Sequence, residues 1–125
     1  MNDLIGLQYA WAHRPLDGSG FTDCFQLSCE VRKRMGLIDH SPLYSWVYEQ
    51  YDESTFTPRR LARFLFQSGT RTSVATIGNM VLVDGPTGAL GTVTEYGIIY
   101  IGAGRQVIHR PGLLLTTSYF DMDQS

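Results

Sequence analysis

The sequence predicts an α+β domain in which N-terminal helices pack on a C-terminal antiparallel sheet. In the first half of the chain, up to about residue 68, capping residues precede segments whose apolar residues are spaced three and four apart, as in amphipathic helices. Short apolar and β-branched runs, separated by turns that contain glycine, make up the remainder of the chain. With 125 residues and 43% hydrophobic content, the chain can bury one core, so we expect a single domain over residues 1–125.

Four helices are expected in the first half, each opened by a side chain that commonly caps helices. They span approximately residues 2–12, 24–35, 43–51 and 59–67. The second helix has the clearest signals, because Thr22 or Asp23 can cap it, apolar residues follow one face, and Gly36 ends it. The third and fourth each begin with a Ser-Pro or Thr-Pro pair, which suits an N-cap followed by the first helical turn.

The strands expected in the second half are approximately residues 80–84, 92–101, 105–110 and 113–120, with a turn or loop at 86–91. Gly102-Ala103-Gly104 fits a three-residue hairpin loop. In that register Ile101 faces Arg105, Gly97 faces His109, and Glu95 faces Pro111. Glu95 and His109 are then diagonal neighbours on one face of the sheet, about 7 Å apart at the backbone.

Composition excludes several classes of function. The formal charge is −2 and no basic stripe is present, so nucleic acid is not an expected partner. The first residues lack the basic start and apolar run of a signal peptide, and no stretch has the length of a membrane span. The histidines are dispersed and form no Cys/His pair at ligand spacing, so neither a metal nor a cofactor is expected.

Cys24 is the residue with the clearest potential for chemistry. A helix N-terminus favours the thiolate, because unpaired backbone N–H groups and the helix dipole stabilise negative charge there. Papain-like enzymes place their nucleophile on such a turn, against an antiparallel sheet that carries the base. An isolated cysteine on an apolar helix face is, however, usually a core residue. Cys29 lies five positions on, about 140° around the helix, so the two thiols cannot bridge.

Three stretches together resemble the NlpC-type cell-wall peptidase family. They are IGLQYAWAHRPLDGSGFTDCFQL, IGNMVLV and EYGIIYIGAGRQVIHRPG, in the family's order. The family typically shows G-x-P-Y-x-W-G-G followed by G-x-D-C-S-G-L, then P-G-D-L-V-x-F, then H-V-G-I-Y-I-G-x-G-x-x-I-H-A. The resemblance covers nearly the whole chain except a helical insert at about residues 41–68.

The resemblance implies a papain-like cysteine peptidase that cleaves γ-D-glutamyl to diamino-acid bonds in peptidoglycan stem peptides. Cys24 corresponds to the nucleophile, Tyr9 to a tyrosine near it, and His109 to the orienting polar residue. Glu95 occupies the position of the family's usual base histidine. If the extra isoleucine of this motif is placed differently in the comparison, Tyr96 occupies that position instead. The Ser-Gly that follows the family's cysteine is replaced by Phe25-Gln26.

A rearranged triad is one interpretation of this departure, with Cys24 as nucleophile, His109 as base and Glu95 as its orienting carboxylate. His13, in the loop before Cys24, is a second conceivable base, although the family places none there. His109 as a half-buried packing residue is the plainer interpretation. His40, which follows Asp39 ahead of an N-cap, is expected at the surface.

Two functions remain open on the sequence, and enzymatic activity is undecided between them. The first is a small peptidoglycan endopeptidase, and the second is the same fold kept as a structural or assembly protein after the loss of its base. A lone domain of this family without a signal peptide needs a delivery device. We therefore expect a component of a bacteriophage tail or baseplate, in the virion or in the bacterial cytoplasm before assembly, bound to other tail or baseplate proteins. A toxin-type effector exported by a secretion machine is the alternative.

Overall fold

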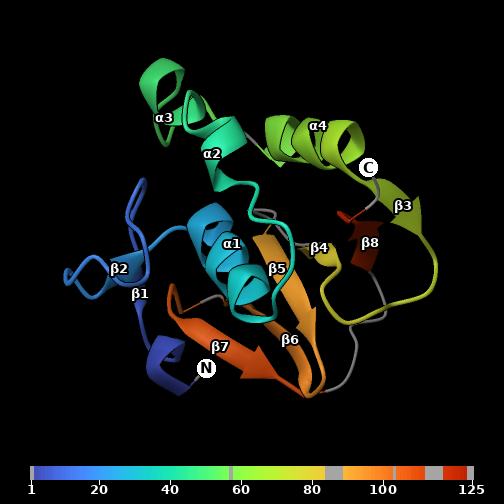
Figure 1. The fold of residues 1–125 in the computed structure, drawn as a ribbon. Coiled ribbons are helices and arrows are strands. Elements are labelled where there is room, and N and C mark those ends of the chain that lie inside the picture. The colour runs from blue at the N-terminus through green and yellow to red at the C-terminus, as the bar shows by residue number, and fades with distance from the viewer. Residues whose placement is uncertain (1, 57, 84–88, 103, 112–116, 124–125) are drawn as a thin grey trace.

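The computed structural model of the chain describes residues 2–56, 58–83, 89–102, 104–111 and 117–123. Helices come first and strands follow, with the exception of two short strands near the N-terminus (Figure 1). The helical elements are η1 (Asn2–Leu4), α1 (Cys24–Arg34), α2 (Ser41–Tyr44), α3 (Val47–Gln50) and α4 (Pro58–Ser68). The strands are β1 (Gln8–Tyr9), β2 (Phe21–Thr22), β3 (Thr70–Thr72), β4 (Met80–Val83), β5 (Ala89–Thr94), β6 (Gly97–Ile101), β7 (Val107–Arg110) and β8 (Thr117–Asp121).

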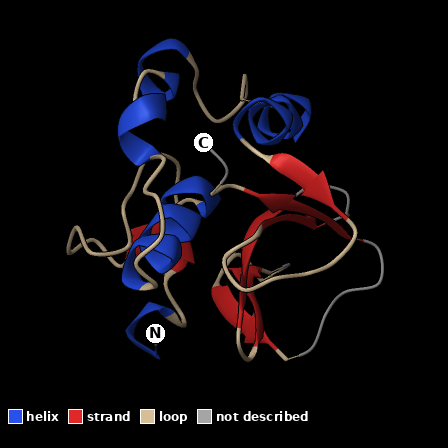
Figure 2. Ribbon diagram, turned by 45° about the vertical axis from the view of Figure 1, so that its right-hand side comes forward, coloured by secondary structure: helices blue, strands red, loops and turns tan. Residues whose placement is uncertain are grey.

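Six strands form one antiparallel sheet in the order β3-β8-β4-β5-β6-β7. The sheet is strongly curved, and α1 packs along one of its faces, mainly against β5 and β6 (Figure 2). Strands β1 and β2 form a separate parallel pair beside α1. The α+β prediction is therefore confirmed at the level of a helix packed on an antiparallel sheet.

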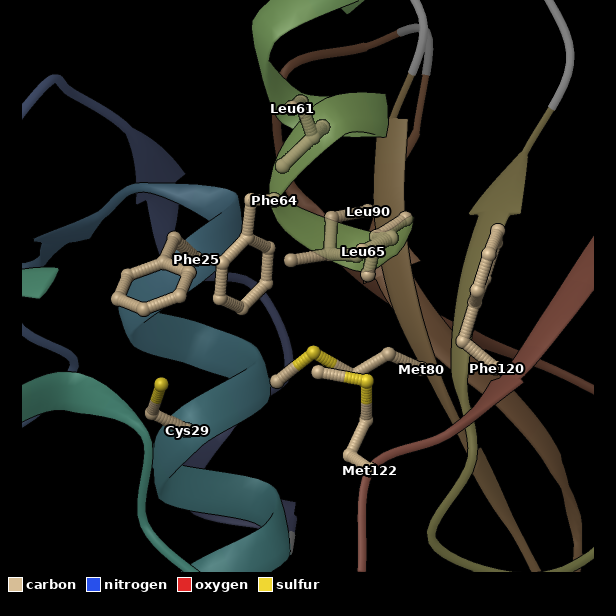
Figure 3. Close-up of a cluster of buried hydrophobic side chains, with 9 residues drawn as sticks. All are labelled: Phe25, Cys29, Leu61, Phe64, Leu65, Met80, Leu90, Phe120 and Met122. Atoms are coloured by element: carbon tan, nitrogen blue, oxygen red, sulfur yellow. The ribbon is translucent and has the colours of Figure 1, made fainter. Parts of the chain in front are cut away.

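The core between the helices and the sheet is built mainly from aromatic, leucine and methionine side chains. Figure 3 shows the largest cluster, to which α1, α4 and strands from the middle of the sheet contribute. Its buried members are Phe25, Cys29, Leu61, Phe64, Leu65, Met80, Leu90, Phe120 and Met122. The ring of Phe64 meets those of Phe25 and Tyr44 nearly edge-on, at centroid distances of 5.1 and 4.4 Å. Helix α4 thus covers the start of α1 rather than extending into solvent.

Helix α1 begins where the sequence predicts it, and its cap is Asp23 rather than Thr22. Asp23 has an extended backbone, and its Oδ1 accepts a 2.7 Å hydrogen bond from the backbone N–H of Gln26. At the other end, Gly36 follows the C-cap with a φ of 76°, a conformation that favours glycine. Asp23 and Gly36, which the sequence predicts as the start and stop signals, therefore mark the two ends of this helix.

A buried arginine ties the C-terminal half of α1 to distant parts of the chain. The Arg32 side chain is fully buried and forms an ion pair with Asp123, with 2.6 Å between Nη2 and Oδ1. Its guanidinium also donates to the backbone carbonyls of Gly78 and Ile38. Arg32 thereby fastens the segment after α1, the turn before β4 and the end of β8 to one helix. No local signal in the sequence predicts this role for Arg32.

Several helical predictions need correction. The helix expected over residues 2–12 is a single 3-10 turn, because β1 leaves it to pair with β2. The helix expected at 43–51 is two one-turn helices, α2 and α3, while the fourth helix agrees with α4. His40 is buried, not at the surface, and its Nε2 lies 3.0 Å from the backbone oxygen of Met122.

The strand predictions need correction in register. Residues 92–101 are not one strand, because a tight turn at Glu95 and Tyr96 separates β5 from β6. His109 pairs with Ile99 rather than Gly97, and Ile101 pairs with Val107 rather than Arg105. The β6–β7 connection is longer than expected because Arg105 adopts a φ of 60° and Gln106 bridges to Gln8 instead.

Two further strand segments differ from the prediction. Strand β3 was not predicted at all. Residues 89–91, which were expected in a turn or loop, instead begin β5. Residues 86–88 of that expected loop lie outside the described residues, and so do residues 113–116 of the expected last strand.

None of the helices in the described part of the chain has the length and apolar content needed to cross a bilayer.

Candidate functional site

The candidate site lies at the N-terminus of α1, where Cys24 is the first helical residue. The Cys24 side chain is partly buried and packs against the core cluster. The backbone N–H of Leu90, on β5, interacts with the Cys24 sulfur. The sequence prediction that a helix N-terminus would present this thiol to the sheet is thus matched by the structure.

Asp23, directly before Cys24, is the organising residue of this region. Besides capping α1, its carboxylate accepts from the Ala12 backbone N–H at 3.0 Å and from the Tyr48 hydroxyl at 2.7 Å, both at Oδ2. Burial raises the pKa of Asp23, while hydrogen bonds from Gln26, Tyr48 and Ala12 act in the opposite direction. This single carboxylate therefore joins α1, the preceding loop and α3.

The surroundings of Cys24 oppose ionisation of its thiol. Burial is the largest cause of a Cys24 pKa raised to about 12, and charge repulsion from the neighbouring Asp23 carboxylate contributes to the same rise. The Leu90 N–H and the backbone N–H groups at the start of α1 lower it only in part. The expectation that the helix N-terminus makes this thiol easy to ionise is therefore wrong, because burial outweighs the helix dipole.

Tyr9 lies near Cys24, as the resemblance implies. Burial raises the pKa of the Tyr9 hydroxyl, and the charges of Glu53, Cys24 and Asp23 act in the same direction. The Arg105 guanidinium stacks 4.7 Å from the centroid of the Tyr9 ring and forms an ion pair with Glu53 at 3.6 Å. Three segments thus converge at Tyr9, which are β1, the β6–β7 loop and the loop after α3.

Aromatic side chains form the wall beside this site. The Trp11 ring lies 5.0 Å from that of Tyr48 and 5.7 Å from that of Phe56, between centroids. These contacts hold the helical insert against the loop that precedes Cys24. Trp11 belongs to the motif that suggested the family, whereas Tyr48 and Phe56 come from the insert, for which the sequence offered no signal.

His109 is not beside Cys24. Its Nε2 lies 2.6 Å from the Thr94 hydroxyl, and the Tyr96 ring lies edge-on to the imidazole, 6.4 Å away between centroids. Thr94 and Leu90 are four residues apart on β5, which corresponds to roughly 13 Å along a strand. The Cys24 thiol interacts with Leu90, and the His109 imidazole binds Thr94. The thiol and the imidazole therefore lie at opposite ends of the interface between α1 and the sheet.

Glu95 does not join either residue. It is exposed in the turn between β5 and β6, where its carboxylate interacts with the Tyr96 hydroxyl and raises the pKa of that tyrosine. The diagonal pairing expected for Glu95 and His109 depended on a register that the hairpin does not adopt. Of the four site residues predicted from the sequence, Tyr9 is the one whose hydroxyl is influenced by the charge of Cys24, whereas His109 binds Thr94 and Glu95 lies in the exposed β5–β6 turn.

A papain-like peptidase carries its catalytic base on the sheet surface opposite the nucleophile. In this chain the sheet surface opposite Cys24 is apolar. Leu90 is fully buried there among the aromatic and methionine side chains of the core. His13 Nδ1 lies 3.0 Å from Oδ2 of Asp17 at the surface, and His40 Nε2 lies 3.0 Å from the backbone oxygen of Met122, so both already have partners. Among the described residues, we find no imidazole positioned to accept a proton from Cys24.

The described residues also contain no group of three or more histidine, cysteine, aspartate or glutamate side chains arranged to hold a metal ion. No known protein family, curated protein or solved structure matches the chain significantly.

Proposed function

We propose that this chain is a component of a bacteriophage tail or baseplate that has an NlpC-like fold and acts as an assembly protein rather than as a peptidase. The observation that carries this proposal is the environment of Cys24, in which a partly buried thiol adjoins a buried carboxylate and faces Leu90. A cysteine nucleophile needs a thiolate or an adjacent base, and these surroundings favour neither.

The NlpC-like part of the proposal is supported by the order and placement of the elements. A cysteine begins α1, α1 packs on an antiparallel sheet, and Tyr9 lies near the thiol. The three motif stretches fall on these same elements. The helical insert that departs from the family forms the aromatic wall and contributes Tyr48 to the hydrogen bonds of Asp23. The assembly role follows from this scaffold combined with the loss of the base.

A peptidase that uses Cys24 is the second candidate function, and the proximity of Tyr9 to Cys24 favours it. Incubating the purified protein with peptidoglycan, beside a Cys24→Ala variant, separates the two functions. We expect neither protein to release muropeptides. Release by the unmodified protein that is abolished in Cys24→Ala would overturn the assembly proposal and establish the peptidase.

A pair of histidine substitutions tests whether the site is a degenerate one. Leu90→His places an imidazole opposite the thiol, whereas Glu95→His, the position indicated by the motif, places it in the exposed β5–β6 turn. If activity can be restored, Leu90→His restores it and Glu95→His does not. Circular dichroism of both variants establishes that each is folded. Activity gained in Glu95→His alone would contradict the placement of the base opposite Leu90.

The location has its own test. Mass spectrometry of purified particles of the phage that encodes the chain is expected to detect it together with tail proteins. Its detection only in the soluble fraction of the lysate, never in particles, would contradict the assignment to the virion.

A further inference from the structure

The charges of the central part of the chain are separated into two blocks. No lysine or arginine occurs between Arg34 and Arg59, a stretch that contains Asp39, Glu49, Asp52 and Glu53. No acidic residue occurs between Glu53 and Asp84, a stretch that contains Arg59, Arg60, Arg63 and Arg71. A chain whose net charge is only −2 therefore has an acidic block followed directly by a basic block.

The acidic block presents an exposed face on α2 and α3, which we call the acidic patch. It consists of Leu43, Trp46, Glu49 and Gln50, all of them exposed. Leu43 and Trp46 keep 66% and 42% of their accessible surface, which is high for such large apolar side chains. The spacing of three and four residues places these side chains on one side, while Val47 and Tyr48 point inward.

The basic block presents a second exposed face, which we call the basic patch. It consists of Arg63, Phe66 and Gln67 on α4 and Arg71 on β3. Phe66 is 60% exposed, and its ring meets that of Phe120 edge-on at 5.1 Å. Arg71 pairs with Phe120 across the β3–β8 ladder, so the two residues share one face of the sheet. Phe66 and Arg71 are therefore both neighbours of Phe120.

The two patches do not neutralise each other within one molecule. No ion pair among the described residues involves Glu49 or Arg63. In Figures 1 and 2, α3 and α4 lie apart at the same end of the molecule, and the Arg60 guanidinium near the start of α4 stacks 4.4 Å from the centroid of the Tyr51 ring just after α3. The acidic patch combines exposed Leu43 and Trp46 with the carboxylate of Glu49. The basic patch combines exposed Phe66 with the guanidinium groups of Arg63 and Arg71, so the two patches carry charges of opposite sign.

We propose that the chain associates head to tail with a second copy of itself, the acidic patch of one copy docking on the basic patch of the next. Trp46, Leu43 and Phe66 supply the apolar surface to be buried, and Glu49, Arg63 and Arg71 set the orientation. Because two different surfaces meet, the contact is heterologous, and each added copy leaves one patch of each kind free. This inference goes beyond the proposed function and holds whether or not Cys24 is reactive.

Charge reversal on each patch tests the proposal. The basic patch is reversed in Arg63→Glu/Arg71→Glu, and the acidic patch in Glu49→Arg/Gln50→Arg. Analytical ultracentrifugation of the unmodified protein is expected to show concentration-dependent association that weakens as salt is raised from about 50 to about 500 mM. Each reversed variant alone is expected to associate at least tenfold more weakly. Their equimolar mixture is expected to regain association, because the mixture again contains opposite charges across the contact.

Two results overturn the proposal. One is an unmodified protein that stays monomeric at low salt and at about 100 μM, which would leave the patches to a different partner or to none. The other is association that persists in both variants alone, which would place the contact elsewhere. Circular dichroism establishes that the variants fold, and Trp46→Ala, which leaves every charge in place, tests the apolar part of the contact separately. A peptidoglycan assay on the same samples distinguishes failure here from failure of the proposed function.

Discussion

The two ends of helix α1 carry buried charges of opposite sign, and each charge holds together segments that are distant in sequence. Asp23, at the N-terminal end, binds Ala12 and Tyr48. Arg32, near the C-terminal end, binds Ile38, Gly78 and Asp123. Both charges complement the helix dipole, which favours an anion at the N-terminus and a cation at the C-terminus.

The difference between the two ends lies in what adjoins each charge. Arg32 has a carboxylate partner in Asp123, whereas Asp23 has only uncharged donors and stands next to Cys24. Its negative charge opposes a negative charge on that thiol. In an active papain-like site, the neighbours of the cysteine stabilise the thiolate. Here the donors near Cys24 hydrogen-bond to the Asp23 carboxylate, and that carboxylate disfavours the thiolate.

The largest expected effect comes from removing the buried guanidinium. Arg32→Met keeps much of the side-chain volume but leaves Asp123 and two backbone carbonyls without their donor. We expect a loss of about 3 kcal/mol in the free energy of unfolding, measured by urea denaturation. Asp123→Asn, in which the two carbonyl contacts of Arg32 remain, is the matched control and is expected to cost less. Equal losses in both variants would show that the ion pair alone carries the effect.

The next effect comes from the opposite end of α1. Asp23→Ala removes the helix cap and the acceptor for Ala12 and Tyr48, so we expect a loss of about 2 kcal/mol in the same measurement. Asp23→Asn keeps oxygen-based capping without the charge. It should be more stable than Asp23→Ala and should have a lower Cys24 pKa than the unmodified protein. An unchanged Cys24 pKa in Asp23→Asn would contradict the charge repulsion described here.

A smaller effect is expected when the helical insert loses its hydrogen bond to Asp23. Tyr48→Phe keeps the ring contact with Trp11 but removes the hydroxyl donor, for an expected loss of about 1 kcal/mol. Trp11→Leu, which leaves the hydrogen bond and removes the ring contact, is the complementary variant. Native-state hydrogen exchange should show faster exchange in residues 41–50 in both variants, because both contacts fasten this segment.

The pH dependence of stability gives the smallest effect. The folded-state pKa of Cys24 is raised from 9.0 to about 12, so the folded state favours the protonated thiol. The stability contributed by this thiol is therefore complete below about pH 9 and is lost as the pH rises toward 12. In Cys24→Ala, the decline in the free energy of unfolding above about pH 9 should be shallower by up to about 1.4 kcal/mol per pH unit. Identical slopes in the two proteins would contradict the raised pKa.

The sequence predicts the helix that carries Cys24 because its cap, its apolar face and the glycine that ends it are all local signals. It does not predict the relation of that helix to His109, which depends on hairpin register. Gly102 and Gly104 suggested a three-residue loop after β6. The turn at Glu95 and Tyr96 divided what looked like one strand, and the bridge from Gln106 to Gln8 lengthened the next connection. These are interactions between distant segments, which local propensity does not encode.

The partners of Asp23 and Arg32 were also beyond local signals. Arg32 lies in a run of three basic residues, Arg32-Lys33-Arg34, that resembles a solvated helix face. Only the packing of β8 and the turn at Gly78 buries it. No local signal distinguishes Tyr48 from other aromatic residues, because its hydrogen bond to Asp23 depends on how α3 packs against the start of α1. Both cases depend on where the insert and the C-terminal strand lie.

The protonation state of Cys24 tests most directly whether the site is a peptidase or a scaffold. The protein is labelled with ¹³C at the cysteine Cβ, and the Cys24 signal, assigned with Cys24→Ser, is followed by NMR as the pH is raised. We expect the Cys24 signal to remain that of a thiol at neutral pH and to shift only as the pH approaches about 12, well above the pKa of about 8.5 of a free cysteine thiol. A midpoint below about pH 7 would show an activated thiolate and would contradict the assignment of this site to a structural role.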